Sequence, residues 1–117
     1  MLQFSILPHD DALVAQVGGL VSMTAWEKLL REMENALGSR QHDRLVVNLT
    51  ELVGWLGVSE RTKVGELMAT HLCGMKKVAL YIQREKITGV VQAEAQRHGL
   101  DLRLFSEYDA AFSWAVS

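Results

Sequence analysis

The chain has 117 residues, of which 49% are hydrophobic and 22% are charged, with a formal net charge of −2. This length and balance are typical of one globular domain over residues 1–117, and they exclude an intrinsically disordered protein. The charge is too close to neutral for a dedicated nucleic-acid binder, which would be strongly basic. The apolar stretches are far shorter than the roughly 20 residues of a transmembrane helix.

The N-terminus and the cysteine content indicate the cellular setting. Residues 1–6 lack the basic stretch that opens a secretory signal peptide, and Pro8 follows soon after. The single cysteine, Cys73, excludes an intramolecular disulfide. These features favour a reduced, cytoplasmic setting.

In chain order, the first predicted elements are a hairpin of two strands and a helix. Residues 2–7 alternate apolar and polar side chains, as a half-buried strand does, and residues 12–17 form the second strand. Gly18 and Gly19 then break the strand pattern. The helix that follows ends at Gly38. Its apolar stripe consists of Trp26, Leu29, Leu30, Met33 and Leu37.

A strand, a loop and a second helix come next. Residues 44–50 are almost continuously apolar, which is typical of a strand covered on both faces. A loop containing Gly54 and Gly57 separates this strand from a helix that Gly74 ends. Ser59 is the residue that we expect to cap the start of this helix.

The remaining elements continue the alternation. Residues 78–83 form a strand, a helix begins near Thr88 and stops at Gly99, and residues 100–105 form a last strand before a helix that carries Phe112. The order is therefore β-β-α-β-α-β-α-β-α. It predicts an α/β fold with a mainly parallel mixed sheet, an antiparallel edge hairpin and packed helices.

The common catalytic and metal-binding motifs are missing from the sequence. It lacks the glycine-rich loops of P-loop and dinucleotide-binding proteins. No histidine lies at metal-ligand spacing with another histidine or with Cys73, so we expect no metal site and no cofactor. We expect His71 to be a satisfied interior histidine and Cys73 to be half-buried. The protein is predicted not to be an enzyme; the enzymatic alternative would need a pocket with a perturbed histidine or carboxylate.

Two loops that follow neighbouring strands carry the candidate site. Ligands of open α/β sheets collect beyond the carboxyl ends of the strands, where residues 51–59 and residues 84–88 should lie side by side. The first loop is unusually apolar for a loop in solvent, with Trp55, Leu56 and Val58. Four basic residues flank this apolar group: Arg61, Lys63, Arg84 and Lys86.

Both features of the candidate site have two interpretations. Cations near helix N-termini oppose the helix dipole at a cost of about 0.3–1 kcal/mol each, which a bound anion would offset. Alternatively, Glu60, Glu66 and Glu85 neutralise these cations on a solvated face. Trp55 is either a lid that folds over the core or an exposed contact with a ligand or partner.

Several segments together resemble one family over essentially the whole chain. They are the opening hairpin, the glycine pair before the helix with Trp26, residues 45–49, residues 77–80 and residues 104–114. In pattern and order they resemble the SpoIIAA-like proteins, compact relatives of the STAS domain (sulphate transporter and anti-sigma factor antagonist). The resemblance implies a sheet with stacked helices, a cytoplasmic bacterial setting, and a regulatory module that binds a protein partner, as a monomer or a homodimer.

The sequence departs from this family at the phosphorylation motif. Anti-sigma factor antagonists carry an Asp-Ser-Ser-Gly-type motif after the third strand, whereas residues 56–59 here read Leu-Gly-Val-Ser. Ser59 is the only candidate phosphoacceptor, without the flanking Asp and Gly. The lipid-carrying CRAL-TRIO domains, which are similar in fold, imply an alternative. In it, the Trp55–Leu56 loop and the flanking cations bind a lipid or amphipathic anion and contact a membrane surface. A hollow beneath Trp55 would favour the ligand, and a filled space would favour a protein partner.

Overall fold

The computed structural model describes residues 2–38 and 42–117, which form five strands, four α-helices and a 3₁₀ turn. The strands are β1 (Leu2–His9), β2 (Ala12–Leu20), β3 (Arg44–Val53), β4 (Lys77–Tyr81) and β5 (Leu102–Phe105). The helical elements are α1 (Met23–Gly38), α2 (Val58–His71), the 3₁₀ turn η1 (Arg84–Lys86), α3 (Val90–Arg97) and α4 (Tyr108–Val116). None of the helices in the described ranges is both long and apolar enough to cross a membrane.

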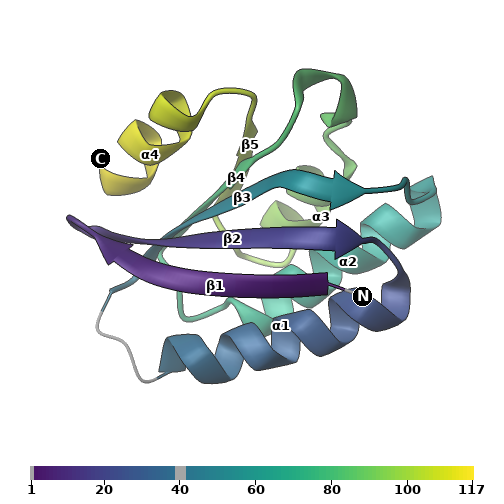
Figure 1. Ribbon diagram of the computed structural model, residues 1–117, viewed down its shortest axis with the longest axis horizontal. Coiled ribbons are helices and arrows are strands. Elements are labelled where there is room, and N and C mark those ends of the chain that lie inside the picture. Colours follow the sequence, from purple (N-terminus) through teal and green to yellow (C-terminus); the bar gives the residue numbers. More distant parts are fainter. Residues whose placement is uncertain (1, 39–41) are drawn as a thin grey trace.

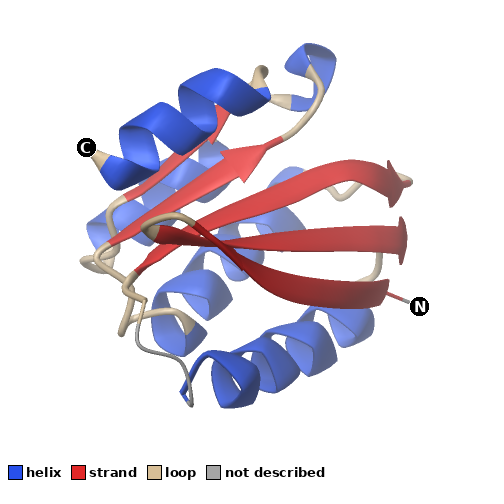
Figure 2. Cartoon of the chain, turned by 60° about the vertical axis from the view of Figure 1, so that its left-hand side comes forward, coloured by secondary structure: helices blue, strands red, loops and turns tan. Residues whose placement is uncertain are grey.

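The strands form one sheet in the order β1-β2-β3-β4-β5. β1 and β2 pair antiparallel, and the other neighbours pair parallel, which confirms the predicted α/β fold with an antiparallel edge hairpin. Successive right-handed crossovers in one direction place α1, α2 and α3 on the same face of the sheet. Helix α4 follows the last strand and covers part of the other face (Figures 1 and 2).

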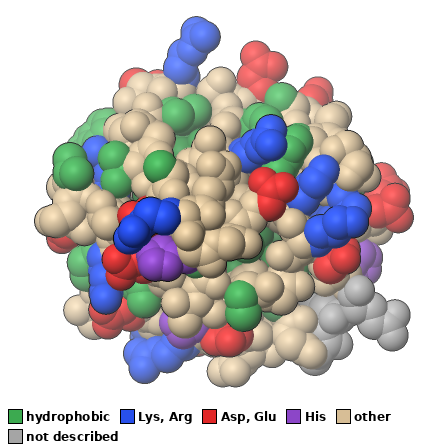
Figure 3. Space-filling model, turned by 180° about the vertical axis from the view of Figure 1, so that it is seen from behind, with side chains coloured by type: hydrophobic (Ala, Val, Ile, Leu, Met, Phe, Trp, Pro, Cys, Tyr) green, Lys and Arg blue, Asp and Glu red, His purple; other side chains and the backbone are tan. Residues whose placement is uncertain are grey.

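The main hydrophobic core lies between the sheet and α1, α2 and α3. Helix α1 buries the whole predicted stripe from Trp26 to Leu37 against the sheet. A smaller cluster beneath α4 joins Val46 and Ala79 of the sheet to Ala111 and Ala115 of the helix. From behind (Figure 3), the surface carries basic, acidic and histidine side chains interspersed with apolar ones.

Strands β2 and β3 each extend three residues beyond their predicted ends, to Leu20 and Val53. The prediction that Gly18 and Gly19 break the strand is wrong. The register between β2 and β3 shifts just before Gly18, as at a β-bulge, and pairing then continues. A Cβ at Gly18 would lie 3.0 Å from the Cβ of Glu51, so glycine permits this close approach.

The start of α2 also differs from the prediction. Gly57 is the N-cap, and its backbone N–H donates a hydrogen bond of 2.9 Å to Oε1 of Glu60. The Glu60 side chain therefore satisfies the helix start from the first turn, as the glutamate of a capping box does. Ser59 lies exposed in that first turn, so its predicted capping role is wrong.

Three further expectations concern the end of α2 and the stretch that follows it. His71 is partly buried, and its Nδ1 lies 2.7 Å from Oε1 of Glu34, which fits a satisfied histidine. Cys73 is exposed because it lies beyond the end of α2, so the expected half-burial is wrong. β4 ends at Tyr81, two residues earlier than predicted, and α3 begins at Val90 after the η1 turn.

Candidate functional site

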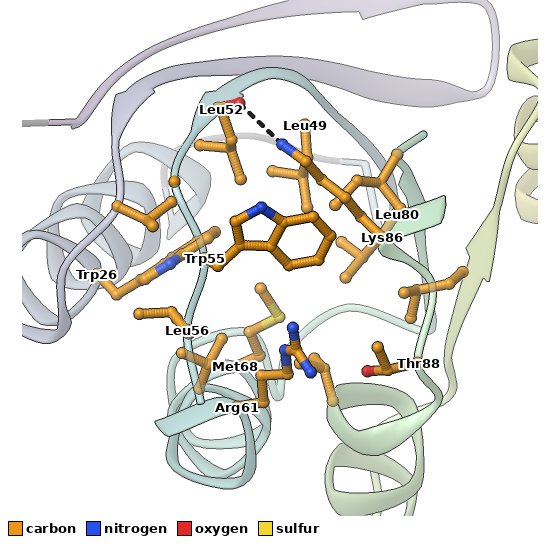
Figure 4. A pocket seen from close by; sticks show the side chains of 16 residues that line it. Trp26, Leu49, Leu52, Trp55, Leu56, Arg61, Met68, Leu80, Lys86 and Thr88 are labelled. Atoms are coloured by element: carbon orange, nitrogen blue, oxygen red, sulfur yellow. Dashed lines mark hydrogen bonds between the residues drawn. The ribbon is translucent and has the colours of Figure 1, made fainter. Parts of the chain in front are cut away.

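A pocket of about 90 Å³ lies at the carboxyl ends of β3 and β4, on the face that α1, α2 and α3 cover (Figure 4). It opens to solvent, and its walls are mostly apolar. A dry apolar cavity of about 150 Å³ is large enough for benzene, so a hollow of the present size suits a smaller hydrocarbon group. Its apolar lining includes Trp26, Leu49, Met68, Leu80 and Val91.

Trp55 lies at the mouth of this pocket. Residues 54–57 connect β3 to α2, and Gly54 has a φ of 103°, a conformation that favours glycine and turns the chain there. The indole lines the pocket and yet is 62% exposed. Trp55 therefore partly covers the hollow and is partly exposed to solvent, and its contact with a ligand or partner stays a prediction.

Two cations approach the indole ring of Trp55. The guanidinium carbon of Arg61 lies 5.8 Å from the ring centroid, and Nζ of Lys86 lies 5.5 Å from it. Nζ of Lys86 also donates a hydrogen bond of 3.2 Å to the backbone oxygen of Leu52. In Figure 4 the two side chains reach the ring from different sides, one from α2 and one from η1. Each cation–π contact contributes about 0.5–1 kcal/mol at an exposed site, which helps to hold the ring over the pocket.

The structure brings only some of the predicted site residues together. Trp55, Leu56, Arg61 and Lys86 all line the pocket. Val58 and Ser59 lie exposed at the start of α2 and are not part of the lining.

The other two predicted cations lie away from the pocket. Nζ of Lys63 is 3.7 Å from a carboxylate oxygen of Glu66, an ion pair of the kind that the solvated-face alternative predicts. Arg84 is exposed in η1 and does not line the pocket. The local excess of positive charge at the pocket therefore comes from Arg61 and Lys86.

The sequence did not predict two exposed apolar residues at the strand ends that precede Trp55. Leu20 and Val53 are 59% and 61% exposed, and they pair with each other at the ends of β2 and β3. Trp55 and Val58 are also exposed, and the four residues, which lie at the ends of β2 and β3 and between β3 and the start of α2, are here called the apolar rim. No sequence signal marked them, because both strands were predicted to end before these residues.

The lining of the pocket combines apolar side chains with a few polar ones. Among the described residues, its lining includes no histidine, cysteine or carboxylate. The lining therefore supplies no acid–base pair of the carboxylate or imidazole kind and no set of metal ligands. It offers apolar surface, two cations and the side chain of Thr88.

Comparison with solved structures identifies the fold. The chain is similar to an anti-sigma factor antagonist from Mycobacterium paratuberculosis, with a TM-score of 0.70 and 14% identity over 100% of this chain and 96% of that one. It is also similar to an uncharacterized DUF3478-family protein with a SpoIIAA-like fold from Shewanella loihica PV-4. For that pair the TM-score is 0.62 and the identity 18%, over 97% of this chain and 93% of that one.

The chain has the SpoIIAA-like fold. This confirms, for the fold, the resemblance drawn from the sequence. No protein-family model and no curated protein matches the sequence significantly. At these sequence identities the similarity shows only a shared fold, so function has to be argued from the site.

Proposed function

We propose that this SpoIIAA-like protein is a non-enzymatic binding module whose ligand is an amphipathic acid held at the Trp55 pocket. The observation that carries the proposal is an apolar hollow beneath an exposed tryptophan with two cations at its mouth. The apolar walls would take a hydrocarbon group. Arg61 and Lys86 would take the carboxylate or phosphate that this group bears.

The contacts that such a ligand would replace are weak. Arg61 and Lys86 now face an indole ring, and Lys86 also has one uncharged backbone acceptor. A charge-assisted hydrogen bond to an acid is roughly twice as strong as a hydrogen bond between neutral groups. Each methylene that leaves water for the pocket adds about 0.8 kcal/mol, or about fourfold in affinity. Both terms favour an occupant that is apolar at one end and anionic at the other.

The apolar rim fits a lipid as the source of this acid. Trp55 exposes apolar surface beside the two cations, and the other residues of the apolar rim are exposed at the adjoining strand ends and helix start. Apolar surface combined with cations is what binds an anionic lipid surface. A free fatty acid would supply the same chemistry without a membrane. Two measurements distinguish these sources. Native mass spectrometry of the purified protein would detect a bound free acid, and a binding assay with vesicles of anionic phospholipid would detect contact with a membrane surface.

The test compares cations at the pocket with cations outside it. Titration with hexanoate and with uncharged 1-hexanol is measured for the parent protein, for Arg61→Gln/Lys86→Gln and for the matched control Lys63→Gln/Arg84→Gln. We expect hexanoate binding to weaken about tenfold or more in the pocket variant only, because a hydrogen bond to a charged group contributes about 1.5–3 kcal/mol. Hexanol binding should change little. Failure of the parent protein to bind hexanoate, or equal losses in both variants, would contradict the proposal.

A regulatory protein partner is the second candidate. The apolar rim extends beyond the pocket opening, and one protein of similar fold is an anti-sigma factor antagonist. Trp55 and Val58 would supply apolar contacts, and a phosphate on exposed Ser59 would lie at the N-terminus of α2, where the helix dipole favours negative charge. Pull-down with the parent chain, Trp55→Ala and Ser59→Ala tests this candidate. Partners retained equally by all three proteins would exclude it.

A further inference from the structure

Helices α2 and α3 approach each other closely on the outer side of the main core. At Gly65 of α2, a Cβ would lie 2.8 Å from the Cβ of Glu94 and 2.8 Å from the backbone oxygen of Val91. Because no side chain separates the helices there, polar side chains beside this contact come within reach of one another. They are Glu66 of α2, Glu94 of α3 and His98 at the C-terminal end of α3.

These three side chains converge on one point. A ligand atom from each of Glu66, Glu94 and His98 lies within 4.8 Å of the other two. Glu94 and His98 are four residues apart on the same side of the helix, and Nε2 of His98 is 3.0 Å from Oε2 of Glu94. Zinc bonds of about 2.0–2.2 Å place tetrahedral ligand atoms about 3.4 Å apart. Small side-chain rotations would therefore close the group around an ion.

We propose that Glu66, Glu94 and His98 form a binding site for a divalent transition-metal ion such as Zn²⁺. The imidazole distinguishes this group from an ordinary acidic patch, because it favours zinc, copper or nickel over magnesium and calcium. Three protein ligands leave the fourth tetrahedral position to water. The ion would join α2 to α3, and the site does not depend on the proposed function of the Trp55 pocket.

A guanidinium group now neutralises part of this cluster. Nη2 of Arg97 lies 2.9 Å from Oε2 of Glu94, and Nε lies 3.3 Å from both carboxylate oxygens. The hydrogen bond from Arg97, opposed by partial burial and reinforced by His98, holds the pKa of Glu94 below its usual value. The Arg97 side chain is 69% exposed, so it can turn into solvent when an ion takes its place.

The test is calorimetric titration of the tag-free protein with ZnCl₂, with MgCl₂ as the comparison ion. All proteins carry Cys73→Ser, because the exposed thiol of Cys73 would otherwise bind zinc. We expect one zinc ion per chain. The affinity should fall by about 10- to 100-fold or more in His98→Ala and in Glu66→Gln, since even the loss of a residue that supports a ligand has an effect of that size. Lys63 pairs with Glu66 and Arg97 pairs with Glu94, so both cations compete with the ion. Arg97→Ala removes the closer of the two and should bind zinc more tightly.

His71→Ala is the matched control. His71 and Glu34 form a second histidine–glutamate pair, with a separation of 2.7 Å, but they are not part of the three-residue group. The control should bind zinc as the parent protein does. The proposal is overturned if the parent binds no zinc stoichiometrically, if either Glu66→Gln or His98→Ala leaves the affinity unchanged, or if His71→Ala weakens binding as much as His98→Ala does. If a ligand variant fails to fold, Arg97→Ala still tests the proposal, because this variant is expected to bind zinc more tightly than the parent protein does.

Discussion

The substitution Gly65→Ala tests the close contact between α2 and α3, which frames the Trp55 pocket and the proposed metal site. The added Cβ would lie 2.8 Å from the Cβ of Glu94 and from the backbone oxygen of Val91, closer than such atoms pack. The carbonyl oxygen cannot rotate away, as the tip of a flexible side chain could. The helices must therefore move apart, which loosens the packing of buried Val64 and Ala95.

The size of the effect follows from two opposing terms. Overpacking of a tight contact costs about 1–3 kcal/mol, whereas alanine gains up to about 1 kcal/mol over glycine inside a helix. We expect the free energy of unfolding of Gly65→Ala to fall by about 1 kcal/mol. For a domain of this size, this corresponds to a decrease in Tm of roughly 4 °C.

Urea unfolding monitored by circular dichroism measures this difference. The matched control is Gly38→Ala at the end of α1, where no atom of the described residues 2–38 and 42–117 lies within 4 Å of an added Cβ. We expect the control to stay within about 0.5 kcal/mol of the parent protein, as most surface substitutions do. A Gly65→Ala protein as stable as the parent, or more stable, would refute the steric explanation of the helix contact.

Two further predictions concern the pocket wall and the face beneath α4. Met68 is buried and lines the pocket, so Met68→Ala should reduce the free energy of unfolding by about 2–5 kcal/mol in urea denaturation. The enlarged pocket should favour octanoate over butanoate more strongly than the parent does, and an unchanged preference in titration would place the ligand elsewhere. Burial, reinforced by the charge of Asp109, raises the pKa of Tyr108 above its usual value. Its contribution to stability is thus present below about pH 10 and lost as the pH rises through the folded-state pKa. Tyr108→Phe should flatten this alkaline loss in urea unfolding, and an equally steep loss in Tyr108→Phe would show that other groups cause it.

The sequence predicted the elements of the fold better than their ends. The stripe from Trp26 to Leu37 is a local pattern, and α1 buries all of it. The end of β2 was missed because a glycine pair usually breaks a strand, whereas here Gly18 permits the close approach of Glu51 from the neighbouring strand. The end of β3 was missed with it, since residues 51–53 pair with residues 18–20. Pairing of this kind joins residues far apart in the chain, and no local pattern reveals it.

The same distinction holds for the two sites. Trp55 and Leu56 stood out because apolar residues between glycines are unusual in a loop, and both line the pocket. Glu66, Glu94 and His98 lie on two helices, and only the packing at Gly65 brings them together. Their spacing in the sequence therefore matches no metal-binding motif. The expectation of no metal site rested on such spacing alone.

The measurement that tests the Trp55 pocket most directly is an NMR titration of the ¹⁵N-labelled protein with hexanoate, observed at the three indole N–H signals. Trp55 and Trp26 line the pocket, whereas Trp114 lies with α4 on the opposite face of the sheet and serves as an internal control. We predict saturable shifts of the Trp55 and Trp26 signals with Trp114 unchanged, and smaller shifts in Arg61→Gln/Lys86→Gln. Signals of Trp55 and Trp26 that stay in place at saturating hexanoate, or that move only together with Trp114, would contradict a binding site in this pocket.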